Sequence, residues 1–123
     1  MPKSLLILIS GPYMTGTNGD EKKIAENLRR MEEHSLPIFQ KGHLAVVGEW
    51  FSWPIIRGAG GTSHFSPEFH EYQYPVAHRL LEACDALFRI PGDSKGADLE
   101  IEKAKTLGKT IYYSLDEIPH ILN

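Results

Sequence analysis

Glu100 is the residue of this sequence whose type and position point most clearly to chemistry. It lies in a segment, from about Ser94 to Leu107, whose spacing predicts a helix. At ~100° per residue, Glu100 falls within the apolar face of this helix. The other members of that face are Ala97, Ile101, Ala104, Leu107 and Gly108. The sequence therefore predicts one carboxylate that points inward among apolar neighbours.

A buried, unpaired carboxylate costs several kcal/mol, so something must compensate for Glu100. Its place in about the second turn of a helix contributes only ~0.3–1 kcal/mol through the helix dipole. Either a basic group such as Arg89 or Lys95 pairs with it, or the carboxylate opens into a cavity and reacts. In the second case Glu100 is a nucleophile for an electrophilic carbon, such as the anomeric carbon of a sugar, where an oxocarbenium-like transition state is trapped covalently.

Two further residues could support such a reaction from neighbouring segments. Asp85 follows Cys84 where a strand is predicted to begin. It is either a second acid that holds sugar hydroxyls or an ordinary turn residue between helix and strand. Tyr13 follows the first predicted strand and is either a stacking or hydroxyl contact for a ligand or an ordinary loop aromatic.

The segments that must position these residues alternate between strand and helix patterns. Four short apolar runs predict strands at Leu5–Ile9, His43–Val47, Ala86–Ile90 and Thr110–Tyr113. Helices are predicted at Asp20–Ser35, Tyr74–Cys84, Ser94–Leu107 and, from a capping-box pattern, at Ser114–Glu117. Between Gly48 and Glu71, prolines and glycines are expected to interrupt any element. The pattern predicts one α/β domain over residues 1–123, with helices on both faces of a mostly parallel sheet of four to five strands.

The order of these elements also predicts where a ligand binds. In open parallel sheets, ligands lie beyond the carboxyl ends of the strands, near the point where strand order reverses. The candidate site is therefore built from the loops after Ile9, Val47, Ile90 and Tyr113. The helix of Glu100 starts from one of these loops, which favours a reactive carboxylate over a simple ion pair.

The composition excludes several classes of protein. The chain has 123 residues, 41% hydrophobic and 24% charged, which is typical of a globular domain and not of a disordered or fibrous chain. Its formal net charge of −3 lacks the basic surplus of most nucleic-acid binders. The longest apolar run, Leu5–Ile9, is far shorter than the ~20 residues that span a bilayer, and we expect no signal peptide. A single cysteine, Cys84, excludes an internal disulfide and fits a reducing cytoplasm.

Nucleotide-cofactor and metal motifs are absent from the sequence. Gly11 to Gly16 has the glycine spacing of a P-loop, but Thr17 and Asn18 stand where Lys and Ser or Thr are required. His64, His70 and His78 do not have the spacing of a known zinc site. We therefore expect neither a cofactor nor a metal.

The aromatic segment from Trp50 to Ser63 allows two interpretations. Trp50, Phe51 and Trp53 beside a glycine-rich stretch suit a stacking wall and lid for a flat base. They suit an interface between subunits equally well, because aromatic residues anchor subunit contacts.

Four segments together resemble the nucleoside 2-deoxyribosyltransferase family. They are Ile7–Tyr13, Cys84–Leu87, Ser94–Ala104 and Leu107–Lys109. The resemblance covers nearly the whole chain except Gly48–Glu71, and it includes the branch that hydrolyses nucleoside 5′-monophosphates. It implies a flavodoxin-like fold, no metal or redox cofactor, and assembly into homodimers or larger homo-oligomers. It further implies cleavage of the N-glycosidic bond of a nucleoside or its 5′-monophosphate, with transfer of the sugar to another base or to water.

The resemblance also implies roles for single residues. Glu100 is expected to be the nucleophile, Tyr13 to lie beside it and the sugar, and Asp85 to hold sugar hydroxyls. Substrate-binding positions are expected at Ser10, Gly11, Asp85, Ser94 and Gly96. Ser94 favours a 5′-monophosphate, because a hydroxyl and the free N–H groups of a helix start accept a phosphate that an acid would repel. Two other hypotheses stay open: a non-catalytic module that binds or senses a nucleotide, and an assembly domain in which Glu100 is neutralised by a basic group.

Overall fold

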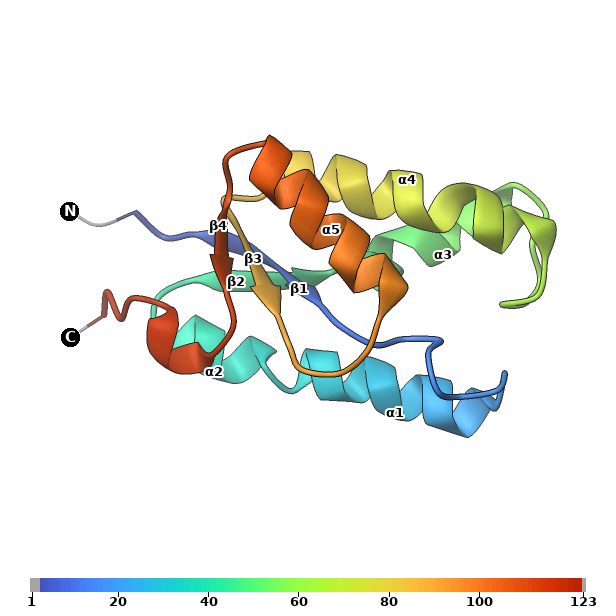
Figure 1. Cartoon of the computed structure of the whole chain (residues 1–123), viewed down its shortest axis with the longest axis horizontal. Coiled ribbons are helices and arrows are strands. Elements are labelled where there is room, and N and C mark those ends of the chain that lie inside the picture. The colour runs from blue at the N-terminus through green and yellow to red at the C-terminus, as the bar shows by residue number, and fades with distance from the viewer. Residues whose placement is uncertain (1–2, 123) are drawn as a thin grey trace.

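The computed structural model describes residues 3–122 and alternates strands with helices (Figure 1). The strands are β1 (Leu6–Ser10), β2 (Leu44–Val47), β3 (Ala86–Arg89) and β4 (Thr110–Tyr112). The helices are α1 (Glu21–Glu32), α2 (Ser35–Gln40), α3 (Gly48–Gly58), α4 (Pro67–Ala83), α5 (Lys95–Thr106) and the 3₁₀ turn η1 (Leu115–Glu117). In the described part of the chain the strands form one sheet in the order β2-β1-β3-β4, with every neighbouring pair parallel. The predicted α/β, flavodoxin-like architecture is confirmed.

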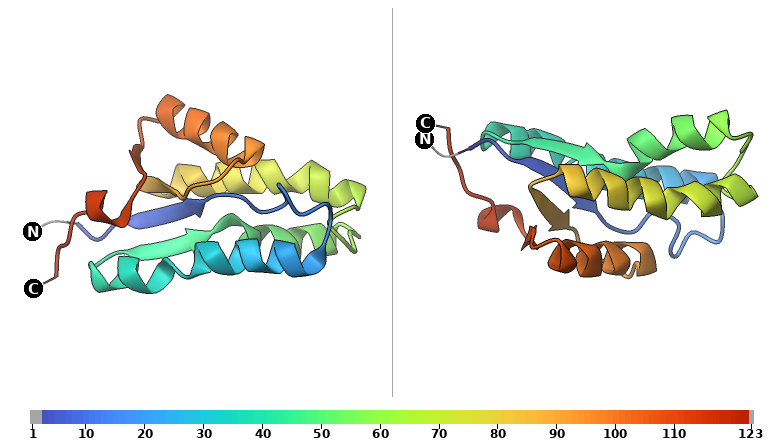
Figure 2. Two further views of the ribbon diagram at one scale, coloured as in Figure 1. Left: turned by 60° about the horizontal axis from the view of Figure 1, so that its bottom comes forward. Right: turned by 90° about the horizontal axis from the view of Figure 1, so that it is seen from above.

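Side chains that alternate along each strand divide the core into two layers. Ile7 and Ile9 of β1 point into one layer, which is covered by α1, α2 and η1, whereas Leu8 points into the other. Leu8 packs there with Leu81 of α4 and Ala104 of α5. Figure 2 shows the sheet between these two groups of helices. Because both faces are covered, the strands are continuous apolar runs, as is typical of parallel sheets.

One of two predicted helix caps forms, and the Ser114 cap of the capping box does not, because the Ser114 side chain makes no cap hydrogen bond. Asp20 caps α1, since its side chain accepts a hydrogen bond from the Lys22 N–H at 2.9 Å. The capping box at the end of the chain forms only a 3₁₀ turn, in which the Glu117 carboxylate accepts from the Tyr113 N–H at 2.7 Å. None of the helices in residues 3–122 is long and apolar enough to cross a membrane.

The prediction of an irregular segment from Gly48 to Glu71 is wrong. Most of the segment is helical: α3 follows β2 without a loop, and α4 begins at Pro67, seven residues before the predicted start at Tyr74. Pro67 stands in the first turn of α4, where its missing N–H is not needed. Pro54 and Pro75 lie inside helices but are exposed, so the carbonyl groups they leave unpaired can bond to water.

Candidate functional site

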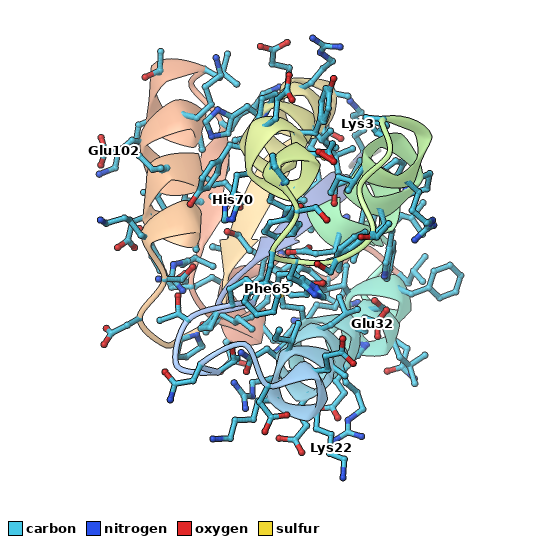
Figure 3. All side chains as sticks on the ribbon, turned by 90° about the vertical axis from the view of Figure 1, so that its right-hand side faces the viewer. Lys3, Lys22, Glu32, Phe65, His70 and Glu102 are labelled. Atoms are coloured by element: carbon cyan, nitrogen blue, oxygen red, sulfur yellow. The ribbon has the colours of Figure 1, made fainter. Side chains whose placement is uncertain are left out.

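A pocket of about 190 Å³ lies beyond the carboxyl ends of the strands, where the strand order predicts a ligand. The last residue of β1, Ser10, pairs in register with Arg89 at the end of β3. The pocket is closed by the loop after β1 and by the starts of α3, α4 and α5. Its lining includes Gly11, Tyr13, Met14, Glu49, Phe69, His70, Gln73, Tyr74, Ala77, Ser94, Gly96, Ala97 and Glu100. Figure 3 looks onto this edge, with the exposed His70 of α4 labelled.

Glu100 of α5 lies in this pocket and is held by Ser10. The Ser10 hydroxyl donates a hydrogen bond to Oε2 of Glu100. Within residues 3–122 Glu100 forms no salt bridge, and Arg89 pairs instead with Asp98, from Nη2 to Oδ1 at 3.1 Å. The structure therefore places Glu100 inward, as its helix position predicts, and argues against neutralisation by a direct ion pair.

The surroundings of Glu100 raise its pKa above that of a carboxyl group in water. Burial raises the pKa of Glu100 to about 7; the Ser10 hydrogen bond opposes this shift, the nearby charge of Glu49 adds to it, and Arg89 opposes it. A carboxyl group with this pKa changes its charge near neutral pH. A carboxyl group with a shifted pKa inside a pocket is a candidate catalytic residue.

Glu49 is a second carboxyl group in the pocket, and the sequence analysis did not identify it. It lies in the first turn of α3, immediately after β2, and only 9% of it is exposed. Gln73 of α4 donates a hydrogen bond from Nε2 to Oε1 of Glu49 at 3.4 Å. Burial raises the pKa of Glu49 to about 7. The rule that sites follow strand ends pointed to the loop after Val47, but the helix that begins there was not predicted.

Tyr13 lies in the pocket wall within an aromatic cluster. Its hydroxyl accepts a hydrogen bond from Trp53 Nε1 at 3.1 Å and lies 2.7 Å from His64 Nε2. Burial raises the pKa of Tyr13 and lowers that of His64, so a neutral phenol and a neutral imidazole share this hydrogen bond, whose direction follows the His64 tautomer. Phe69 completes the cluster, with its ring centre 5.6 Å from that of Trp53.

The aromatic residues of α3 point in different directions, so each of the two interpretations of this segment fits some of them. Trp53 packs inward beside the pocket, whereas Phe51 is 43% exposed on the outside. Trp50 is also exposed and donates from Nε1 to Glu32 at 2.7 Å. Residues 50–58 of the segment are helical, and the glycine-rich residues 59–63 form the turn and loop that follow.

Asp85 does not lie in the pocket. It precedes β3 and therefore lies at the amino edge of the sheet, whereas Ser10 and Glu100 meet at the carboxyl edge. Its carboxylate accepts from the Leu6 N–H at 2.8 Å and pairs with Lys3 at 3.0 Å. These bonds lower the pKa of Asp85. The structure thus corrects the expectation that topology brings Asp85 to Glu100 and gives it the alternative role, that of a turn residue.

The other expected binding positions border the pocket, and each has a packing role. Ser94 caps α5 by accepting from the Ala97 N–H at 3.1 Å. A Cβ on Gly11 would lie 2.3 Å from Ile90 Cγ1, so only glycine fits between the loop and the core. A Cβ on Gly96 would lie 3.0 Å from the ring of Tyr74, which shapes the pocket wall. In the described residues no group of three His, Cys, Asp or Glu side chains could hold a metal ion.

Comparison with known proteins gives a likeness of fold. No model of a protein family and no curated protein matches the chain. A solved structure reported for a 2-deoxyribosyltransferase from the psychrotolerant bacterium Bacillus psychrosaccharolyticus has a TM-score of 0.60 at 17% identity, covering 86% of this chain and 69% of that chain. The chain has the fold of a 2-deoxyribosyltransferase. The resemblance drawn from the sequence is confirmed at the level of the fold, and an identity this low shows the fold alone.

Proposed function

We propose that the protein cleaves the N-glycosidic bond of a (deoxy)nucleoside or nucleoside 5′-monophosphate, with Glu100 as nucleophile. The observation that carries this proposal is the Glu100 carboxyl group in a pocket at the carboxyl edge of the sheet, hydrogen-bonded to Ser10 and without an ion pair to any residue from 3 to 122. The fold shared with a 2-deoxyribosyltransferase supports the substrate class.

The geometry suits attack on an anomeric carbon. The Ser10 hydroxyl fixes one oxygen of Glu100 and favours its ionised form, which leaves the other oxygen for bonding. Gly96 and Ala97 precede Glu100 on α5 and take up little space beside it, so a pentose can approach the carboxylate. Attack from the face opposite the base gives a glycosyl-enzyme, and water or a second base then releases the sugar with net retention.

The test is release of free base from a panel of nucleosides and nucleoside 5′-monophosphates, followed by chromatography. Wild-type protein is expected to release base from at least one compound, and Glu100→Gln to release none. Glu102→Gln is the matched control, because Glu102 is an exposed acid on the same helix that pairs only with Lys105. A second base added to the mixture separates transfer from hydrolysis. Calorimetric binding of a nucleotide without base release over hours favours the alternative, a non-catalytic binding module.

We also propose that the chain forms a homodimer through an apolar groove between α3 and α4. The groove measures about 510 Å³ and is lined by Phe51, Ile55, Glu71, Tyr72, Pro75, Val76, Arg79 and Leu80. Glu71 and Arg79 lie on α4 four residues before and four residues after Pro75. In a two-fold interface centred on Pro75, α4 of one copy runs antiparallel to α4 of the other, and each Glu71 faces an Arg79 of opposite charge. The same patch is therefore complementary to itself in charge, and its apolar residues are covered by those of the second copy.

A further inference from the structure

The carboxyl group of Glu49 has no task in the reaction described so far. It is buried in the pocket that holds Glu100, although it contributes to none of the apolar core clusters. Within the described residues it forms no ion pair, and its side-chain hydrogen-bond donor is the Gln73 amide. Burial of a carboxyl group costs folding free energy, and the described contacts of Glu49 give it no structural role that compensates for this cost.

A cation lies near one of the two carboxyl groups, and a third carboxyl group lies near the other. Arg89 lies near Glu100 and the Ser10 hydroxyl donates to it, and both favour the ionised form of Glu100 against the nearby charge of Glu49. Glu32 lies near Glu49 and favours its protonated form, whereas the Gln73 hydrogen bond favours the ionised form. Because the cation lies beside Glu100, we assign a proton that the two groups share to Glu49 and the negative charge to Glu100.

We propose that Glu49 carries the proton of the reaction, as general acid to the leaving base and then as general base to water, with Gln73 as its positioning residue. This inference rests on the proposed function, because it assigns a residue to that same reaction.

The two steps balance as follows. In the first, a Glu100 oxygen bonds to the anomeric carbon, the carbon–nitrogen bond breaks, and the departing base takes the proton from Glu49. In the second, a water oxygen bonds to the anomeric carbon while Glu49 accepts one of its protons. The ester bond to Glu100 breaks, and its electron pair returns to the carboxylate. Free base and free sugar leave, and both carboxyl groups recover their starting protonation.

Gln73 determines which oxygen of Glu49 carries the proton. Its amide donates to Oε1, so the proton resides on Oε2, which is left for the substrate. The carbonyl oxygen of Gln73 is itself buried and has no hydrogen-bond partner among the described residues. A donor group on a bound nucleoside can satisfy this oxygen after a small rotation of the amide.

The deciding experiment uses a leaving group that needs no proton. Guanosine, its 2′-deoxy form and the 5′-monophosphates of both are compared with their 7-methyl derivatives, whose positively charged base leaves without protonation, after subtraction of uncatalysed release. In Glu49→Gln, release of guanine is expected to fall ~10²–10⁴-fold, whereas first-turnover release of 7-methylguanine stays near the wild-type rate. Azide, which attacks without general base help, is expected to restore steady turnover. Glu102→Gln is the control on both substrates.

Equal losses on both leaving groups, or no loss on either, overturn the role of Glu49. If Glu100→Gln still abolishes release in that case, the proposed function survives and only this inference fails. If the wild-type protein releases base from none of these compounds and from no nucleoside or 5′-monophosphate of the panel, both fail.

A second variant tests the positioning role of Gln73. The titratable groups that face Glu49 from neighbouring elements are Tyr13, Glu32, His70 and Glu100. Because the Gln73 hydrogen bond lowers the pKa of Glu49, Gln73→Leu is expected to move the alkaline limb of the pH–rate profile upward and leave the acidic limb in place. A uniform loss of rate at every pH contradicts the role. Circular dichroism at each pH confirms that the variant is folded.

Discussion

Ser10 donates a hydrogen bond to Glu100 across 90 residues of sequence and so joins the end of β1 to the second turn of α5. This contact makes the carboxylate part of the sheet edge and orients it toward the pocket. Both partners lie on regular elements, which hold a reactive group in place more firmly than loops do.

Removing the Ser10 hydroxyl should change the charge state of Glu100. Ser10→Ala eliminates a hydrogen bond that lowers the pKa of Glu100, so the acidic limb of the pH–rate profile should move to higher pH. The loss of rate should therefore be larger at pH 6 than at pH 8. Base release measured across this range checks the prediction, and an unchanged acidic limb contradicts it.

The two buried carboxyl groups should make the protein less stable as pH rises. Burial raises the pKa of Glu49 and of Glu100 from 4.5 to about 7, so the folded state binds these protons more tightly than the unfolded chain. Their contribution to stability is complete below pH ~4.5 and is lost as pH rises through about 7. At pH 8, Glu49→Gln and Glu100→Gln should each be more stable than the wild type by roughly 2–3 kcal/mol, and near pH 4.5 by almost nothing.

Urea unfolding at the two pH values measures this difference, with the exposed Glu102→Gln as control. The double variant should gain less than the sum of the single variants, because each carboxylate repels the other. Single variants that are as stable as the wild type at pH 8 contradict the burial of these groups.

The hydroxyl of Tyr13 should contribute to stability as well as to the site. Tyr13→Phe leaves Trp53 without its acceptor and His64 Nε2 without its hydrogen-bond partner, at a cost of about 1–3 kcal/mol. Tyr113→Phe, on a tyrosine that is 52% exposed, should cost almost nothing. Thermal or urea unfolding of the two variants tests the contrast, and equal stabilities contradict it.

The proposed dimer predicts a charge-reversal pattern. Arg79→Glu places like charges opposite each other at both ends of the interface and should shift the protein toward monomer. Combining it with Glu71→Arg restores the opposite-charge pairs and should restore the dimer. Sedimentation of the single and double variants measures this. A dimer that survives Arg79→Glu, or a double variant that remains a monomer, contradicts the interface.

Much of the architecture could be predicted because its causes are local. Apolar runs such as Leu5–Ile9 can be satisfied only between two layers of helices, so they indicated a buried parallel sheet. Glu100 was identified by helical periodicity alone, since its neighbours on α5 fix which face meets the sheet. For these elements, residues close in the sequence determine the structure.

The features that could not be predicted depend on contacts between residues that are far apart in the sequence. Pro54 predicts a break in the segment that follows Glu49, but the segment is the helix α3. The burial of Glu49 depends on packing against α4, which the local sequence does not reveal. Asp85 was misplaced for a different reason. It precedes its strand, so the rule that puts ligands at carboxyl ends places it at the opposite edge.

The central claim is that Glu100 bonds covalently to the sugar. The most direct measurement is intact-mass and peptide mass spectrometry of protein quenched with acid during turnover of its best substrate. We expect an added mass equal to the glycosyl group on the peptide that contains Glu100, and no such addition in Glu100→Gln. Turnover with net inversion at the anomeric carbon, or turnover that persists in Glu100→Gln without any adduct, would contradict the account.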